Sequence, residues 1–305
     1  MVDLNGIKKQ LEEVIDSKII DISPVEEGVM NFTYEVQSES SKYILKVNPK
    51  GRENIGVKEL NSIKLCRSKG CKVPEAIYSQ KVDSVNAYSY LFYNKLQGIS
   101  LNAKFDSLGQ SDIQKITSQI VENFSCISSI PLWSYGETSN LKEFSHKSWK
   151  DFLKSECIES ITYLSDNNIF TIDQVRKLDE YFKKEISKVN LSGSSFVWTD
   201  FDPENIIIDD SNNLSGFVDF EGVLGGDPVY AIGSLIAKFG YNGFTELLID
   251  KLNYPKDKLE FYAIMRYLRL IKYSNYSLPT GMERDDINVF LPFSYKKISN
   301  IIYGI

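Results

Sequence analysis

Two short apolar runs of strand type lie between Phe196 and Phe220, inside a region of the chain that otherwise has helical patterning. From Gly98 onwards, long segments carry apolar side chains at the three- and four-residue spacing of one helix face. A single pair of strands within such a region is typical of a β-hairpin packed against helices. The predicted helices around it are Ser111–Ser128, Ser148–Asn167, Ile172–Val189, Tyr230–Phe239 and Lys256–Tyr273.

Three polar side chains lie on or beside this predicted hairpin, whose strands are Ile206–Ile208 and Leu214–Phe220. Asp200 precedes the first strand, Asn205 follows five residues later, and Asp219 lies near the end of the second strand. A hairpin can place all three around one pocket. Mg²⁺ prefers hard oxygen ligands, such as the amide of Asn205 and the carboxylate of Asp219. Asp200 then remains available to accept the proton of a hydroxyl nucleophile, as phosphoryl transfer requires.

Asp and Asn are also frequent in turns, so a purely structural role is the alternative for these residues. We assign that role to the polar segment Asp209–Asn213 between the two strands. For Asp200, Asn205 and Asp219 we favour chemistry, because their spacing coincides with a charged residue placed inside an apolar strand nearer the N-terminus.

Residues 1–97 have a different pattern, in which strands outnumber helices. We predict helices at Gly6–Asp16 and Val57–Ser68, and strands at Phe32–Gln37, Lys42–Val47, Ala76–Lys81 and Tyr88–Tyr93. No long linker separates this region from the rest of the chain. We therefore expect an α+β fold of two lobes, 1–97 and 98–305, the first a small β-sheet lobe and the second larger and mainly helical. A short hinge would join them, with a cleft between.

Lys46 is the charged residue inside an apolar strand, within the run Tyr-Ile-Leu-Lys-Val. Such an amine is costly to bury unless it has a partner of opposite charge. Glu59 on the following predicted helix is the candidate partner, and Glu53 just ahead of that helix is the second choice. The alternative is an edge strand from which the Lys46 amine reaches solvent.

The segment Val197–Gly222 resembles the catalytic and metal-binding segment of the aminoglycoside phosphotransferase and choline kinase superfamily, relatives of protein kinases. That family has His-Gly-Asp, four further residues, Asn, a strand hairpin and Asp, with Gly-Asp-Pro beyond. The resemblance implies that Asp200 is the catalytic aspartate and that Asn205 and Asp219 bind Mg²⁺. Trp198-Thr199 replaces His-Gly here. We expect the Trp198 indole to brace the loop by packing and by donating its N–H.

The same resemblance implies a protein-kinase-like fold that binds ATP, or GTP, between the lobes. Lys46 would contact the nucleotide phosphates and pair with Glu59, as in protein kinases. The loop Glu26–Asn31, with Gly28, would cover the phosphates through its backbone N–H groups. The hinge would hydrogen-bond the base through the backbone of Phe92, Tyr93, Asn94 and Lys95.

Charge and composition exclude several other classes of function. The net charge of −6 and the pI near 5.1 would repel nucleic-acid phosphates. No apolar run approaches the ~18–20 residues of a membrane span, and the N-terminus lacks a signal-peptide core. We therefore expect a cytoplasmic protein, as a monomer or a homodimer. The cysteines form no CxxC pair and the only histidine is His146, so we expect free thiols at Cys66, Cys71, Cys126 and Cys157.

The acceptor is expected to be a cationic small molecule, of the aminoglycoside type or a related amino sugar. The candidate acids that would attract it are Asp151, Glu156, Glu159, Glu283, Asp285 and Asp286, and aromatic side chains could line its pocket at Tyr262, Tyr267, Tyr273 and Tyr276. For the acids the alternative is a solvated surface, and for the aromatics it is core packing. The other functions considered are a choline or ethanolamine kinase, another sugar or antibiotic kinase, and a pseudokinase that binds nucleotide without catalysis.

Overall fold

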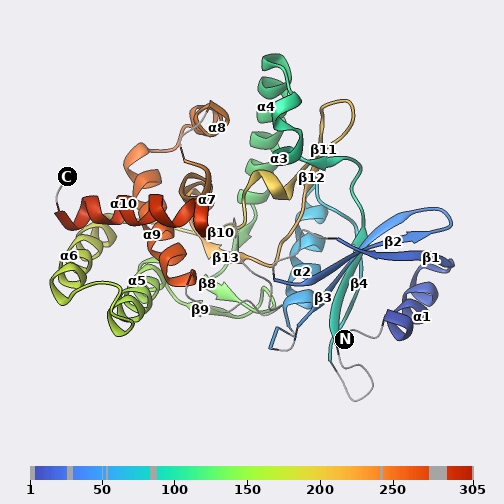
Figure 1. Ribbon diagram of the computed structural model, residues 1–305, viewed down its shortest axis with the longest axis horizontal. Helices are drawn as coiled ribbons and strands as arrows, with labels where there is room; N and C mark the ends of the chain where they lie inside the picture. The colour runs from blue at the N-terminus through green and yellow to red at the C-terminus, as the bar shows by residue number, and fades with distance from the viewer. Residues whose placement is uncertain are drawn as a thin grey trace.

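The computed structural model describes residues 4–25, 30–49, 51–52, 54–82, 88–240, 243–274 and 287–303. An antiparallel sheet forms the N-terminal part, and most of the remaining chain is helical (Figure 1). The expected α+β architecture is therefore confirmed. Within the described residues, no helix is both long enough and apolar enough to cross a bilayer.

The N-terminal sheet has five strands in the order β1-β2-β3-β5-β4. The two central strands carry residues that reach opposite faces, because side chains alternate along a strand. Leu45 and Val47 of β3 belong to a core that also contains Ile7 and Leu11 of helix α1, whereas Lys46 between them faces helix α2. The bounds are α1 Leu4–Ile15, β1 Ile19–Pro24, β2 Phe32–Ser38, β3 Lys42–Asn48, α2 Ile55–Ser68, β4 Ala76–Gln80 and β5 Ser89–Asn94.

Strand β1 was not predicted from the sequence, and it closes one edge of this sheet. It pairs with β2 from Ile19 to Pro24 with an irregularity between Ile19 and Asp21. Ile20 is 64% exposed there, so the strand lacks a regular alternation of buried and exposed apolar residues. The period-2 pattern that identifies strands is weak in such a segment.

Strand β6 (Ile99–Ser100) begins directly after the N-terminal sheet and pairs with the predicted hairpin, β11 (Ile206–Ile208) and β12 (Leu214–Phe217). The approach is close at Gly98, whose φ is +110° and where a Cβ atom would lie 2.0 Å from the Ile208 carbonyl oxygen. The second strand of the hairpin is shorter than expected. It ends at Phe217, because Asp219 has a left-handed φ of 63° and turns the chain towards β13 (Val223–Gly226).

Strand β13 pairs with β10 (Ser194–Trp198), so a second sheet of order β7-β10-β13-β8-β9 supports the chain on both sides of Asp200 and Asp219. Most helices of the C-terminal part lie to the left of this sheet in Figure 1. The remaining bounds are α3 Leu101–Lys104, α4 Gln110–Ser128, β7 Pro131–Leu132, β8 Tyr135–Thr138, β9 Phe144–His146, α5 Trp149–Asp166, α6 Ile172–Lys188, α7 Val229–Phe239, α8 Gly243–Leu252, α9 Lys256–Tyr273 and α10 Ile287–Tyr303.

Helices α7 and α9 form the centre of the helical part. A Cβ atom at Gly233 of α7 would lie 2.6 Å from the Cβ of Tyr262 on α9, so the two helices approach closely at a position without a side chain. Tyr262 is fully buried, and its hydroxyl donates to Asp227 at 2.7 Å and accepts from the Trp149 indole at 2.8 Å. Tyr267 is also buried. These two tyrosines are therefore core residues, as in the alternative considered above.

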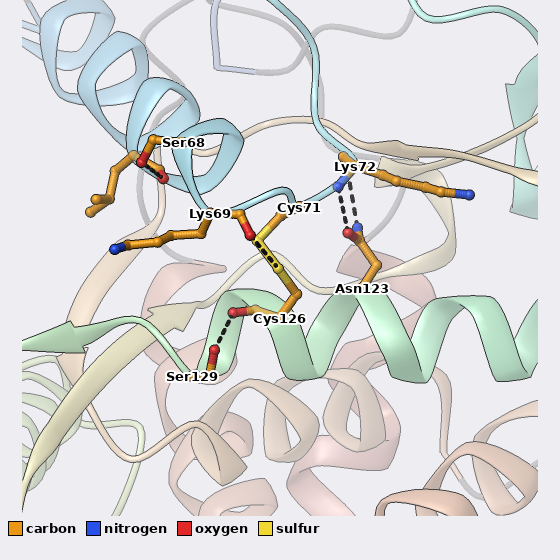
Figure 2. Close-up of a disulfide and its surroundings, with 8 residues drawn as sticks. Ser68, Lys69, Cys71, Lys72, Asn123, Cys126 and Ser129 are labelled. Carbon is orange, nitrogen blue, oxygen red and sulfur yellow. Dashed lines mark hydrogen bonds between the residues drawn. A yellow bond between two sulfur atoms is a disulfide. The ribbon is translucent and has the colours of Figure 1, made fainter.

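The loop after α2 is fastened to α4 by a disulfide between Cys71 and Cys126, whose Cα atoms are 5.8 Å apart (Figure 2). Next to it, Asn123 of α4 donates to the Lys72 carbonyl oxygen at 3.0 Å and accepts from the Lys72 N–H at 2.6 Å. The expectation of four free thiols was wrong for this pair. The two cysteines are 55 residues apart in sequence, and only the tertiary fold brings them together.

Thiol titration tests this pairing. In protein denatured without reductant, we expect two reactive thiols, Cys66 and Cys157, and four after reduction. In the native protein neither should react quickly, because both are buried and burial raises the pKa of each thiol, which for Cys66 reaches about 12. The Cys126→Ser variant is the control and should give three thiols without reductant. Four thiols in the unreduced wild type would contradict the disulfide.

Candidate active site

A cleft of about 850 Å³ contains the residues singled out in the sequence. Its walls come from the N-terminal sheet and α2 on one side, and from β8, the residues that flank the β11–β12 hairpin, α7 and α9 on the other. Lys46, Asp200, Asn205 and Asp219 all line it. The fold thus brings these four predicted site residues together. Gly28 and Glu53 lie outside the described residues, as do the candidate acids Glu283, Asp285 and Asp286 and the aromatic Tyr276.

The Lys46 amine lies between two carboxylates. It contacts both oxygens of Glu59 at 2.9 and 3.1 Å and Asp219 at 3.0 Å. Burial alone would lower the pKa of Lys46, but Asp219 and Glu59 more than offset it, so the pKa lies well above its ordinary value. Glu59 also accepts the Phe220 N–H at 3.1 Å. One buried carboxylate therefore joins β3 and α2 to the segment that carries Asp219.

Asp219 lies in an acidic environment. Oxygen atoms of Glu59, Asp219 and Glu221 fall within 4.8 Å of one another. Burial raises the pKa of Asp219, Glu221 and Glu59 raise it further, and Lys46 only partly counteracts them, so it reaches about 8. A divalent cation would relieve this repulsion and would find hard oxygen ligands, so the donor set fits Mg²⁺.

Glu221 is held by two groups from the N-terminal part of the chain. The Asn31 side chain donates to it at 2.7 Å, and Arg52 forms an ion pair with it at 2.8 Å. Strand β12 ends at Phe217, yet the turn at Asp219 leaves the carboxylates of Asp219 and Glu221 in the same cleft.

Asp200 lies on the opposite side of the cleft from the N-terminal sheet, beside Lys238 of α7. The Lys238 amine is 3.4 Å from the Asp200 carboxylate and 2.7 Å from that of Asp202. Burial would raise the pKa of Asp200, but Lys238 and then Arg266 lower it by more, so the pKa lies below its ordinary value. Asp200 is therefore ionised at neutral pH. Asn205 donates its side-chain N–H to the Asp200 carbonyl oxygen at 2.9 Å, which fixes the amide beside it.

Trp198 occupies the position where the resembled family has histidine, and it braces the loop as expected. Its ring stacks on Phe217 and Phe220 at centroid distances of 4.8 and 5.2 Å, and its indole N–H donates to the Asp219 carbonyl oxygen at 2.7 Å. Thr199 donates both its N–H and its hydroxyl to the Gly222 carbonyl oxygen, each at 2.8 Å. The two residues thereby fasten the Asp200 loop to the Asp219 turn.

The predicted base-binding residues have mixed environments. Phe92 is buried against Tyr43, with ring centroids 4.8 Å apart, and its side chain faces away from Lys46. Tyr93 is buried close to Lys46 and the nearby carboxylates, and burial raises the pKa of its phenol. Tyr93 is therefore the one of the pair whose side chain lies on the Lys46 face of the sheet.

The N–H groups of the next two residues are already used within the protein. Asn94 donates to the Glu75 carbonyl oxygen and Lys95 to the Lys42 carbonyl oxygen, both at 3.0 Å. The Lys95 amine forms an ion pair with Glu35. A base bound at this segment would have to meet other groups than these two N–H donors.

The acids expected to attract a cationic acceptor have other partners. Glu156 forms an ion pair with Arg269 at 2.8 Å, and Glu159 pairs with Lys272. Asp151 accepts from the Ser148 hydroxyl at 2.6 Å, at the N-terminus of α5. Glu156 and Glu159 are therefore already paired with cations, and Asp151 is hydrogen-bonded at a helix end.

Lys46 was the only cation of this cleft, among the described residues, that was predicted from the sequence. The others are Arg52, Lys58, Lys238, Arg266 and Arg269. A usable signal was present for some of them. Lys238 is the only charged residue of the apolar helix α7. Like Lys46 in its strand, it is costly to bury without a partner of opposite charge. Arg266 and Arg269 are one helical turn apart among the apolar side chains of α9.

Residues 21–266 match the Phosphotransferase enzyme family. Among solved structures, the chain is similar to a thermostable mutant of aminoglycoside phosphotransferase APH(4)-Ia with ADP and hygromycin B (15% identity, TM-score 0.73, 98% of each chain covered). It is also similar to aminoglycoside 2'-phosphotransferase-IIIa with GDP (15% identity, TM-score 0.70, 98% of this chain and 99% of that chain). A search of curated proteins finds no match. The chain belongs to the phosphotransferase enzyme family and is a small-molecule kinase with a protein-kinase-like fold.

Proposed function

We propose that the protein transfers the γ-phosphate of ATP, or of GTP, to a hydroxyl group of a small molecule. The observation that carries this proposal is the Lys46–Glu59 ion pair, which lies in one cleft with Asp219 and Asp200. The solved structures similar to this chain contain ADP or GDP, which supports a nucleotide as the phosphate donor.

In this proposal Lys46 binds the phosphates of the nucleotide, and Glu59 holds its amine in place. Asn205 and Asp219 would hold Mg²⁺, which when bound would neutralise charge on the transferring phosphate. Glu221 would add negative charge beside Asp219, because oxygen atoms of the two carboxylates lie within 4.8 Å of each other. For the residues of the nucleotide-covering loop, Gly28 included, the sequence-based assignment stands as a proposal.

Asp200 would orient the acceptor hydroxyl and take its proton. The hydroxyl oxygen forms a bond to the γ-phosphorus, the bond from that phosphorus to the β-phosphate oxygen breaks, and the proton passes to the Asp200 carboxylate. A carboxylate with a lowered pKa is a weak base, so its main contribution would be orientation, which suits the loose transition state of phosphoryl transfer.

The acceptor proposed from the sequence is an aminoglycoside or a related amino sugar, and the similar aminoglycoside phosphotransferases support it as the first class to assay. Choline, ethanolamine and other sugars are the alternatives, and a pseudokinase would release no ADP with any of them. We also propose a cytoplasmic monomer or homodimer. In a reducing cytoplasm Cys71 and Cys126 would be present as thiols.

The Asp200→Asn variant tests the proposed reaction. We expect turnover, measured as coupled ADP release over a panel of aminoglycosides, choline and sugars, to fall by about 10²–10⁴-fold while nucleotide affinity persists. The Asp210→Asn variant is the control, because Asp210 is an exposed turn residue. Near wild-type turnover in Asp200→Asn would show that Asp200 is not the catalytic carboxylate.

The Lys238→Met variant tests how Asp200 is kept ionised. Removing the neighbouring cation raises the pKa of Asp200. Because the carboxylate must be deprotonated to accept a proton, the acidic limb of the kcat/KM pH profile should move to higher pH. Lys183→Met, at an exposed position on α6, should leave the profile unchanged. An unshifted acidic limb in Lys238→Met would rule out this role for Lys238.

The Trp198→Phe variant tests the brace between the two loops. Phenylalanine keeps an aromatic ring but leaves the Asp219 carbonyl oxygen without its donor, which we expect to cost about 1–3 kcal/mol of unfolding free energy and to lower kcat. Chemical denaturation and ADP release measure the two effects. The matched control is Trp133→Phe, because Trp133 is 68% exposed. Equal stability of the two variants would argue against the brace.

A further inference from the structure

Two cations that line the cleft, Lys58 of α2 and Arg266 of α9, have no ion-pair partner among the described residues. The cleft's other four cations are paired: Lys46 with Asp219, Arg52 with Glu221, Lys238 with Asp202 and Arg269 with Glu156. Among the described residues, Lys58 and Arg266 are therefore the cations of the cleft that a ligand could pair with.

Arg266 is the more unusual of the two. Its Nε is buried and has no hydrogen-bond acceptor. Burial, followed by repulsion from Arg269, lowers the pKa of its guanidinium, and the attraction that Asp200 exerts on it does not compensate. A half-buried guanidinium without a partner costs free energy. Its position in a cleft therefore indicates a ligand that supplies the missing hydrogen-bond acceptor. Arg266 and Asp200 line the same cleft, so a ligand of Arg266 would share that cleft with the proposed catalytic carboxylate.

Lys58 supplies positive charge from the other side of the cleft. It precedes Glu59 on α2, and burial lowers the pKa of its amine although Glu137 and Glu221 act to raise it. Neither carboxylate is within ion-pair distance of Lys58 among the described contacts. Glu137 itself is 63% exposed and lies 3.9 Å from Arg269. Water therefore screens this carboxylate, and it neutralises Lys58 only weakly.

We propose that the acceptor carries an anionic group, a carboxylate or a phosphate, which binds Arg266 and Lys58 while its hydroxyl group lies at Asp200. The inference rests on the proposed phosphotransferase function and assigns it an anionic acceptor in place of the amino sugar proposed from the sequence. A guanidinium matches the two oxygens of a carboxylate or phosphate with paired N–H donors, and an ammonium adds a point charge. A polycation such as an amino sugar would instead meet these two positive charges, one on each side of the cleft.

The reaction itself is unchanged by this assignment. The acceptor hydroxyl oxygen bonds to the γ-phosphorus, the bond to the β-phosphate oxygen breaks, and the hydroxyl proton passes to Asp200. The anionic group takes no part in the transfer. Arg266 and Lys58 would contribute by holding the acceptor in one orientation and by offsetting the repulsion between its anion and the carboxylates of the cleft.

A set of acceptors with one carbon skeleton tests the proposal: glucose, glucosamine, gluconate and glucose 6-phosphate, assayed by ADP release and, with AMP-PNP and Mg²⁺ present, by calorimetric binding. We expect gluconate or glucose 6-phosphate to bind at least about 10-fold more tightly than glucose, and glucosamine no better than glucose. The two anions distinguish a carboxylate site from a phosphate site. Tighter binding of glucosamine, or equal binding of all four, overturns the proposal.

The Arg266→Gln variant separates a ligand contact from an effect on Asp200. Loss of a contact raises KM and Kd about 10–100-fold for the anionic acceptors alone, whereas a change in Asp200 alters kcat for every acceptor alike. Lys58→Met should act in the same direction. The control is Arg176→Gln, an exposed residue of α6 paired with Asp173 and Glu180, which should change neither. An Arg266→Gln variant that retains the anion preference would falsify the assignment.

The two proposals fail in distinguishable ways. Binding of the anions that depends on Arg266, with no ADP release for any acceptor, would leave the anion site standing and remove the phosphotransferase function. ADP release that favours glucosamine or aminoglycosides would support the phosphotransferase function and remove the anion site.

Discussion

The arrangement of the cleft depends on one buried ion pair. Lys46 and Glu59 come from a strand and a helix of the N-terminal part, and Glu59 reaches further to the Phe220 N–H next to Asp219. Removing either charge would leave the other buried without a partner, which typically costs about 3–5 kcal/mol. The pair therefore couples the stability of the fold to the position of the site. It also explains why a lysine is tolerated within an otherwise apolar strand.

The features that could be predicted from the sequence are those set by local patterns. The apolar run around Lys46 identifies a strand with one charged position, and the helical spacing after Gly98 identifies most of the helices. Asp200, Asn205 and Asp219 line one cleft, as their spacing in the sequence predicted. Trp198 could be assigned a bracing role because an indole supplies both a large ring and a donor.

The features that could not be predicted depend on contacts between distant segments. The Cys71–Cys126 pairing and the salt bridge that occupies Glu156 require the tertiary arrangement. Helix α10 contains Pro292, and a proline inside a helix removes a hydrogen bond and argues against the assignment on local grounds. The charge of the pocket could not be predicted either, because it depends on which acids and cations pair in the folded chain. Arg266, for example, has no ion-pair partner among the described residues.

The short strand β6 has a mechanical consequence. It joins the end of the N-terminal sheet to the β11–β12 hairpin through backbone pairing, and the contact between Gly98 and Ile208 leaves no space for a shift in register. The two Lys72–Asn123 hydrogen bonds, together with the Cys71–Cys126 disulfide in the oxidised protein, provide a second attachment between the same two parts. A rigid swing of one part against the other would strain both attachments at once. Opening and closing of the cleft should therefore arise from flexing of the outer strands β1 and β2, while the attached parts of the sheet keep their positions.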